Sequence, residues 1–158
     1  MIKKLKITLA ILLPLLLLSC GFKKINEKED KLIYFQNINI VGERKIAYYL
    51  KNDILLISNK NSVNKYNAEI QVAKQKTDKI KDKTGKITRY NLSITVNLKL
   101  INLKDNKKIL RSFARNEDYD VAKIHSDSIN NENGTIKNIT QQLSDDINNF
   151  INISMRYK

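Results

Sequence analysis

The stretch from residue 90 to residue 100 constrains the fold most, because its side chains alternate strictly between apolar and polar. The apolar positions are Tyr90, Leu92, Ile94, Val96, Leu98 and Leu100, and the polar positions between them are Asn91, Ser93, Thr95, Asn97 and Lys99. Successive side chains of a strand point to opposite faces of a sheet. The pattern therefore predicts a strand over residues 89–101, about 43 Å long, with one face in a core and the other in water.

Five further elements are expected along the chain. A β-rich run predicts a first strand over 33–41, the alternation from Tyr66 to Val72 predicts a second strand, and Ile109 to about Asn116 predicts a fourth. Apolar residues recur at helical spacing over 44–57 and over 131–155. The second helix would be about 37 Å long, which matches the strand 89–101. Asp53 falls within the apolar arc of the first helix and conflicts with a wholly apolar face.

Each of these elements has one apolar face, and each apolar face needs a cover. The simplest arrangement lays both helices across one face of a four-stranded sheet. Short connections after the second strand make that sheet mostly antiparallel. The sequence thus predicts one α+β domain over residues 32–158, with two layers and with the other sheet face polar and open.

The N-terminus has the layout of a secretory signal peptide. Three lysines precede an apolar run, Ile7 to Leu18, which is shorter than the roughly 20 residues that a membrane span needs. Residues 17–20, Leu-Leu-Ser-Cys, match the lipobox of bacterial lipoproteins, in which the cysteine receives a diacylglycerol and becomes the first residue after cleavage. We expect a signal peptide over 1–19, and a lipid anchor on Cys20 followed by a tether over 20–31. The alternative is an uncleaved anchor helix.

Lipidation and charge together narrow the location and the partners. Position 21 is Gly, whereas Asp after the lipidated cysteine resembles a signal for retention in the inner membrane, so we expect the periplasmic face of the outer membrane. The net charge of +13 favours anionic partners. Nucleic acid is not expected, because a secreted lipoprotein rarely meets it. A coding bias toward Lys and Asn on solvated faces explains the same charge without any ligand.

Catalytic and cofactor motifs are not found. His125 is the only histidine and precedes a serine and an aspartate, but residues adjacent in a loop seldom converge as a hydrolase triad must. Residues 80–88 fail the phosphate-binding loop pattern, because Ile80 replaces its first glycine and Ile87 its hydroxyl residue. No cluster of metal ligands occurs. We expect no enzyme and no cofactor, and a tethered hydrolase using His125 is the remaining enzymatic alternative.

Cationic side chains surround the turns on either side of strand 89–101. They are Lys74, Lys76, Lys79, Lys81, Lys83, Lys86 and Arg89 around the first turn, and Lys104, Lys107, Lys108, Arg111 and Arg115 around the second. We expect two neighbouring cationic regions beside the open sheet that would bind phosphate groups. The alternative is a solvated, lysine-rich hairpin.

Five short segments stand out in order along the chain. They are Cys20-Gly21-Phe22-Lys23, Leu50-Lys51-Asn52-Asp53-Ile54, Thr88-Arg89-Tyr90-Asn91-Leu92, Tyr119-Asp120 and Leu143-Ser144-Asp145-Asp146-Ile147. Together they resemble the LptE family of lipopolysaccharide-assembly lipoproteins. The chain departs from the family pattern at Lys24, where the family favours Pro, and at Gly134, where it favours an Ala-rich helix. The first strand also lacks the Pro-containing exit of the family.

The resemblance implies a four-stranded sheet with two helices, seated as a plug inside the LptD β-barrel. Such a protein helps to assemble the barrel and to deliver lipopolysaccharide to the outer leaflet, and it catalyses no reaction. The resemblance places Arg89 first among candidate lipopolysaccharide-binding residues, and the basic turns add Lys83, Lys86, Lys107 and Lys108. For Arg89 the alternative is a pair with a cross-strand carboxylate such as Glu69. For the whole protein the alternative is an escort or pilot of another outer-membrane barrel or secretin.

Overall fold

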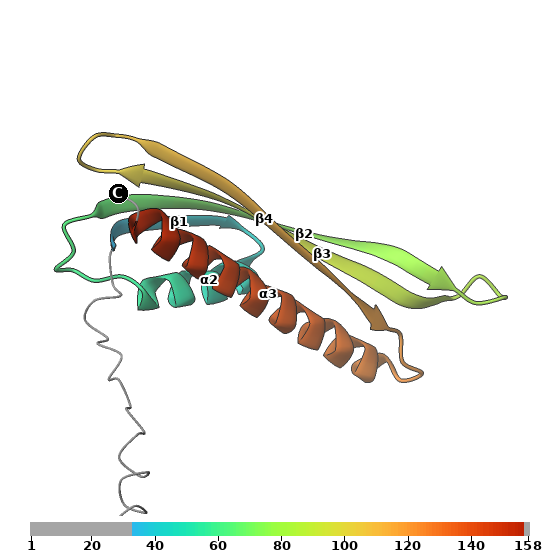
Figure 1. The fold of residues 1–158 in the computed structure, drawn as a ribbon. Helices are drawn as coiled ribbons and strands as arrows, with labels where there is room; N and C mark the ends of the chain where they lie inside the picture. The colour runs from blue at the N-terminus through green and yellow to red at the C-terminus, as the bar shows by residue number, and fades with distance from the viewer. Residues whose placement is uncertain (1–32, 157–158) are drawn as a thin grey trace, which may run out of the picture.

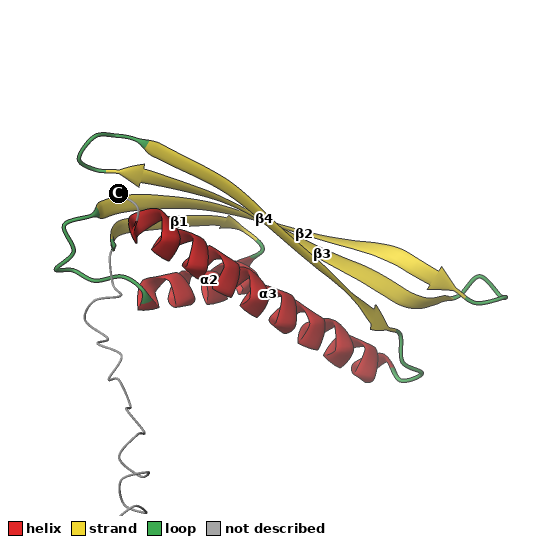
Figure 2. Cartoon of the chain, in the orientation of Figure 1, coloured by secondary structure: helices red, strands yellow, loops and turns green. Residues whose placement is uncertain are grey.

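A computed structural model describes residues 33–156 of the chain (Figure 1). The elements are β1 (Tyr34–Gly42), α2 (Arg44–Leu56), β2 (Lys65–Lys81), β3 (Ile87–Asn102), β4 (Lys108–Asp120) and α3 (His125–Arg156). Both helices lie against the same face of one sheet (Figure 2). The predicted two-layer α+β architecture is therefore confirmed. The predicted signal peptide, Cys20 and the tether lie outside the described residues.

The sheet has the order β1-β2-β3-β4. β1 runs parallel to β2, because α2 carries the chain back to the starting end of the sheet. β2, β3 and β4 form an antiparallel meander through two hairpin turns. The prediction of a mostly antiparallel sheet is thus confirmed, and the single parallel pair follows from the helix between β1 and β2.

Two strands are longer than the sequence pattern predicted. β2 continues to Lys81, although its apolar alternation ends at Val72, and β4 continues to Asp120 rather than ending near Asn116. The additional residues of both strands pair with the first half of β3, so that β3 is paired on both sides along almost its whole length. Backbone pairing to a long central strand therefore extends both neighbours beyond the point where their apolar alternation ends.

The core lies between the helix layer and the sheet. The alternating positions of β3 are buried as predicted, and they are Leu92, Ile94, Val96, Leu98 and Leu100. The stripe of α3 is buried beside them and consists of Ile136, Ile139, Leu143, Ile147 and Ile151. This shared burial of apolar surface is the main stabilising term of the fold.

The core-facing side of α2 is narrower than predicted. Ile46, Leu50 and Ile54 are fully buried at a spacing of four residues. Tyr49 and Leu56, which the sequence placed in the same apolar arc, are 48% and 70% exposed. They lie with Asp53 on the side of α2 that faces α3, so Asp53 does not enter the core.

A glycine ends β1 where the chain turns into α2. Gly42 has φ of +115°, and a Cβ atom there would lie 1.9 Å from the carbonyl oxygen of Val72. Only glycine permits both this backbone conformation and so close an approach of β2.

The last helix is longer than predicted. α3 begins at His125 instead of residue 131, and the Ser128 hydroxyl accepts a hydrogen bond of 2.9 Å from the Ala122 amide before the first turn. Within residues 33–156, no helix is long and apolar enough to cross a membrane.

Candidate functional site

The β2–β3 hairpin carries Lys83 and Lys86 at its tip, beyond the end of the helix layer (Figure 1). The Asp82 carboxylate accepts hydrogen bonds from the Thr84 hydroxyl, the Thr84 amide and the Lys86 amide at 2.6, 2.8 and 3.0 Å. These bonds lower the pKa of Asp82, and the bond from the Thr84 hydroxyl has the largest effect. The turn is thus held in one shape and presents both lysines to solvent.

Arg89 lies at the base of this tip and makes a cross-strand ion pair. Its Nε donates to Oδ1 of Asp120, its partner in the β3–β4 register, at 2.6 Å. The pair raises the pKa of Arg89 and lowers that of Asp120. Glu69, the partner considered from the sequence, instead bonds Lys99 at 2.8 Å. The Arg89 side chain remains 41% exposed, so a ligand can reach it.

Lys107 and Lys108 lie at the opposite end of the sheet, in the β3–β4 turn. Consecutive hairpin turns of a meander face opposite ends, and the 16 residues of β3 separate these two turns by about 50 Å. The two turns are therefore not neighbours, contrary to the prediction, and the cationic regions around them meet only where Lys74 and Arg115 flank Ile94 of β3. Lys107 lies 3.3 Å from the Asp105 carboxylate, and Asn106 has φ of 57° in the turn.

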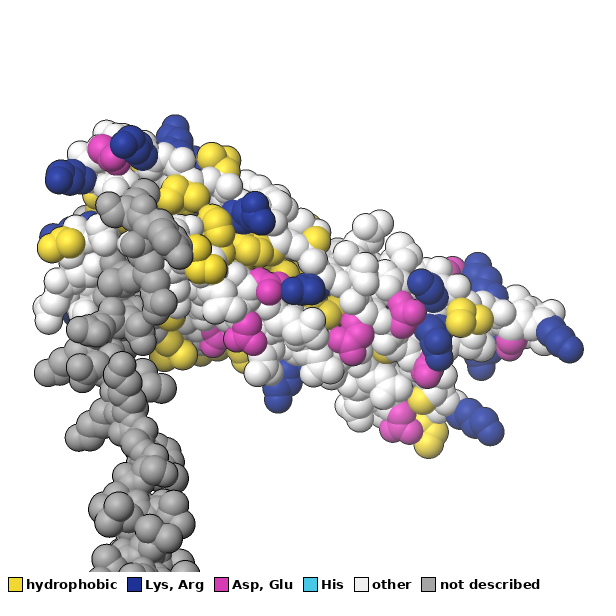
Figure 3. Space-filling model, in the orientation of Figure 1, with side chains coloured by type: hydrophobic (Ala, Val, Ile, Leu, Met, Phe, Trp, Pro, Cys, Tyr) yellow, Lys and Arg dark blue, Asp and Glu magenta, His cyan; other side chains and the backbone are white. Residues whose placement is uncertain are grey.

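Most of the basic residues along β2 are already paired. The pairs are Lys74 with Glu43 at 3.9 Å, Lys76 with Glu132 at 2.7 Å, Lys79 with Asp118 at 3.9 Å and Lys81 with Asp78 at 3.1 Å. Lys and Arg side chains gather with acidic ones at the hairpin end of the molecule (Figure 3). Among the candidate residues, Lys83, Lys86 and Lys108 make no ion pair with any residue in the described range.

A polar cluster that the sequence did not reveal joins α3 to the sheet where the hairpin leaves the core. Lys76 Nζ and the Tyr119 hydroxyl both donate to Oε2 of Glu132 at 2.7 Å, and the ammonium lies 4.2 Å from the ring centroid of Tyr90. Burial opposes the ionisation of Glu132, but the bonds from Lys76 and Tyr119 outweigh it and lower its pKa. Lys76 occupies a helix-facing position of β2, because it continues the alternation of the core-facing residues from Tyr66 to Val72. This alternation is the one feature of the sequence that could have indicated its place in the cluster.

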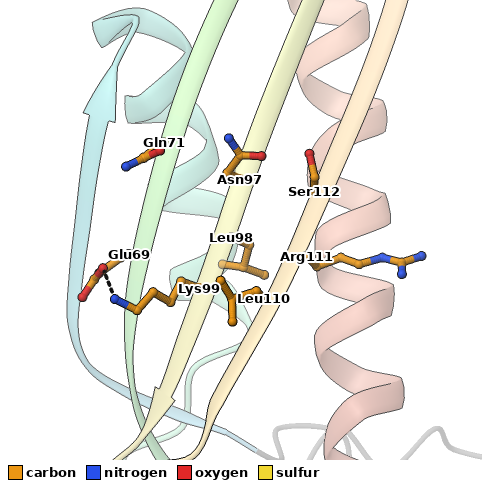
Figure 4. A pocket seen from close by; sticks show the side chains of 8 residues that line it. All are labelled: Glu69, Gln71, Asn97, Leu98, Lys99, Leu110, Arg111 and Ser112. Atoms are coloured by element: carbon orange, nitrogen blue, oxygen red, sulfur yellow. Dashed lines mark hydrogen bonds and ion pairs between the residues drawn. The ribbon is translucent and has the colours of Figure 1, made fainter.

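The open face of the sheet is mostly polar, with Leu110 as an exposed apolar side chain, and it is slightly hollowed at its centre. A shallow depression of about 410 Å³ is lined by cross-strand neighbours from three strands, Gln71, Asn97 and Ser112. The Glu69–Lys99 pair closes one end of it (Figure 4). Such a surface offers neutral hydrogen-bonding groups to water or to a polar partner.

The remaining chemical candidates are dispersed. His125 is exposed at the first residue of α3 rather than in a loop before it. In the part of the chain that the structure describes, no three His, Cys, Asp or Glu side chains come together to hold a metal ion.

Comparison with known proteins agrees with this geometry. The family model described as LptE, lipopolysaccharide-assembly, matches residues 31–151. The chain belongs to the LptE family. It is thereby a member of a family of lipopolysaccharide-assembly lipoproteins of the outer membrane, which are not enzymes. A search of curated protein sequences finds no match.

Solved structures share the fold of this LptE-family chain. A lipoprotein from Caulobacter crescentus has a TM-score of 0.57 at 13% identity, covering 80% of this chain and 91% of that one. Rare lipoprotein B from Shewanella oneidensis has a TM-score of 0.58 at 11% identity, covering 75% and 95%. Lipoprotein B from Nitrosomonas europaea has a TM-score of 0.51 at 16% identity, covering 75% and 83%. At these identities the likeness shows the fold alone.

Proposed function

We propose that the chain is an outer-membrane lipoprotein, anchored through Cys20 on the periplasmic side, that plugs an LptD-like β-barrel. It helps the barrel to assemble and assists the transport of lipopolysaccharide into the outer leaflet. Membership of the LptE family over residues 31–151 carries this proposal.

The surface of the domain suits a plug inside a barrel. The lumen of an outer-membrane barrel is polar, whereas its outer wall is apolar. The sheet face opposite the helices presents Gln71, Asn97 and Ser112, which hydrogen-bond without burying an unpaired charge. A polar wall can therefore pack against this face at low desolvation cost.

Affinity purification from outer membranes in mild detergent tests the partner. We expect an LptD-like barrel in equal amount with the tagged chain, identified by mass spectrometry. Recovery of a different barrel or a secretin would support the escort alternative, and recovery of no barrel would refute the plug.

Lipopolysaccharide contact is assigned to the hairpin tip. Lipopolysaccharide is rich in phosphate, and Lys83, Lys86 and Arg89 offer charge-assisted hydrogen bonds from one side of the molecule. Arg89 adds a planar fork that matches phosphate geometry, although it must share this group with Asp120. Lys107 and Lys108 lie at the opposite end of β3, too far away to reach the same headgroup, and the hairpin assignment leaves them out.

Matched charge reversals separate these two ends of the sheet. We expect Arg89→Asp, and Lys83→Glu with Lys86→Glu, to weaken binding of purified protein to lipopolysaccharide by about tenfold. Lys107→Glu with Lys108→Glu changes the net charge by the same amount as the Lys83 and Lys86 double variant and serves as its control, and Lys107→Glu alone is the control for Arg89→Asp. Equal weakening in both sets would mean that only net charge matters, and unchanged binding would remove the hairpin assignment.

The anchor has its own test. Mass spectrometry of the mature protein should give a chain that begins at Cys20 and carries fatty acyl groups, which hold stably only when two or three chains insert. Cys20→Ala should leave the chain unlipidated. A free thiol at Cys20 or an intact Met1 in the mature protein would contradict the proposed anchor.

A further inference from the structure

A groove runs between α2 and α3 on the helix layer, away from the candidate lipopolysaccharide site at the β2–β3 hairpin. Its volume is about 560 Å³, and its lining includes Tyr49, Asp53, Leu56 and Ile57 on one wall and Asp145 and Asn148 on the other. The α2 wall exposes 48% of Tyr49 and 70% of Leu56. The groove therefore offers exposed apolar surface, and burying that surface under an occupant is favourable.

The groove also presents two carboxylates that no cation of the described residues pairs with. Neither Asp53 nor Asp145 takes part in an ion pair within residues 33–156. Oδ1 of Asn148 is buried and receives no hydrogen bond from any residue that the structure describes, which is a costly state for a polar atom. Lys137 is the one cation among the lining residues. An occupant with cationic groups next to apolar side chains therefore complements this lining.

The first described residue of the chain, Ile33, lies at one end of this groove. Ile33 bridges to Ser58, and its carbonyl oxygen accepts a hydrogen bond of 2.8 Å from the Asn59 amide. Both partners follow directly on Ile57, a lining residue. Any segment that precedes Ile33 therefore starts beside the groove, at the C-terminal end of α2.

The preceding sequence contains a segment with the required chemistry. Residues 22–25 read Phe-Lys-Lys-Ile, two cations between two apolar side chains, and they lie outside the described residues. The intervening residues 26–32 can span up to about 23 Å. Asp53 lies only one helical turn, about 6 Å, before Ile57, so the segment reaches the groove easily.

We propose that residues 22–25 bind in the α2–α3 groove. The ammonium groups of Lys23 and Lys24 face the carboxylates of Asp53 and Asp145, and the flanking apolar side chains cover the exposed groove wall. The segment then holds the N-terminal anchor close to the helix layer, on the side of the domain away from the open sheet face. This docking does not depend on the barrel or on lipopolysaccharide.

Carbodiimide cross-linking of the full, lipidated chain in nonionic detergent tests the contact directly, because the reagent joins only amines and carboxylates that touch. We expect amide links from Lys23 or Lys24 to Asp53 or Asp145, mapped by mass spectrometry. Lys28 and Lys31 belong to the same segment and are the internal control. The proposal is overturned if Lys23 and Lys24 form no such link, or if the control lysines link to these carboxylates equally.

Hydrogen exchange of charge variants provides a second measurement. Lys23→Glu with Lys24→Glu should speed amide exchange near residues 53–57 and 144–148 several-fold, whereas Lys28→Glu with Lys31→Glu should not. Adding Asp53→Lys and Asp145→Lys to the first variant restores the charge pairing and should restore slow exchange. Exchange that is unaffected by the first variant, or that slows only when a barrel partner is added, would overturn the proposal.

Discussion

Replacing Glu132 with Gln tests whether the polar cluster fixes α3 against the sheet. One oxygen of Glu132 accepts from both Lys76 and Tyr119 at 2.7 Å. The substitution keeps the shape of the side chain, removes its charge and leaves the Lys76 ammonium without a counter-charge. The effect therefore reports on the charged part of the interaction.

The expected loss is modest because the cluster is partly solvated. A hydrogen bond to a charged group contributes about 1.5–3 kcal/mol. The side chains of Lys76 and Glu132 are 37% and 26% exposed, so water replaces part of this interaction. We expect Glu132→Gln to lower the free energy of unfolding by about 1 kcal/mol at pH 7, which corresponds to about 4 °C in Tm for a domain of this size.

The pH dependence of the free energy of unfolding provides a second, independent test of the same interaction. The pKa of Glu132 in the folded protein lies below its ordinary value of 4.5. Its contribution is therefore complete above that value and is lost as the pH falls through the folded pKa. The stability difference between wild type and Glu132→Gln should persist at pH 7 and shrink toward pH 3.

Urea unfolding followed by circular dichroism at pH 7 and pH 3 measures both effects. Glu117→Gln is the matched control, because Glu117 lies on β4 near Tyr119 and makes no ion pair within the described residues. Equal losses in the two variants at pH 7, or a loss that does not shrink at pH 3, would refute the reasoning.

Three other substitutions have defined outcomes in the same unfolding assay. Gly42→Ala should cost at least about 2 kcal/mol, because its Cβ would lie 1.9 Å from the Val72 carbonyl oxygen; a change under half that value would contradict the packing at the end of β1. Leu143→Ala should cost about 3 kcal/mol, because the side chain is fully buried, and a surface-like loss would mean that α3 does not cover the sheet. Arg115→Gln should cost less than about 1 kcal/mol and nothing in 1 M salt, since its two hydrogen bonds to Asp146 are half exposed; a loss that persists in salt would show a buried role.

The architecture could be predicted because the long strand β3 and the long helix α3 each separate apolar from polar residues cleanly between their two faces. The alternation over residues 90–100 and the stripe from Ile136 to Ile151 each extend over several repeats, so one face of each element is unambiguous. Two elements with one apolar face each have few ways to pack, and the two-layer fold follows.

The far half of β2 could not be predicted because its helix-facing positions are charged. Lys74, Lys76 and Asp78 stand where the pattern requires apolar residues, and the first two are paired with Glu43 and Glu132 from other elements. Those partners are distant in sequence. Local patterns therefore ended the strand at the wrong residue.

The cationic residues of the candidate site could be predicted from the sequence, but their positions relative to one another could not. The basic turns at residues 82–86 and 103–107 are close in sequence, yet the length of β3 places them at opposite ends of the sheet. The partner of Arg89 is Asp120, which is 31 residues away and is paired through the β3–β4 register. Charge patterns along a chain identify cations, whereas strand register decides which of them meet.

The central claim is that this LptE-family lipoprotein supports lipopolysaccharide assembly, and depletion in its native cells tests it most directly. Surface lipopolysaccharide, labelled on intact cells, is measured as the protein is depleted, with a resupplied wild-type copy as the control. We predict that surface lipopolysaccharide falls while the total amount persists inside the envelope, and that resupply restores it. Unchanged surface lipopolysaccharide after complete depletion would contradict the account.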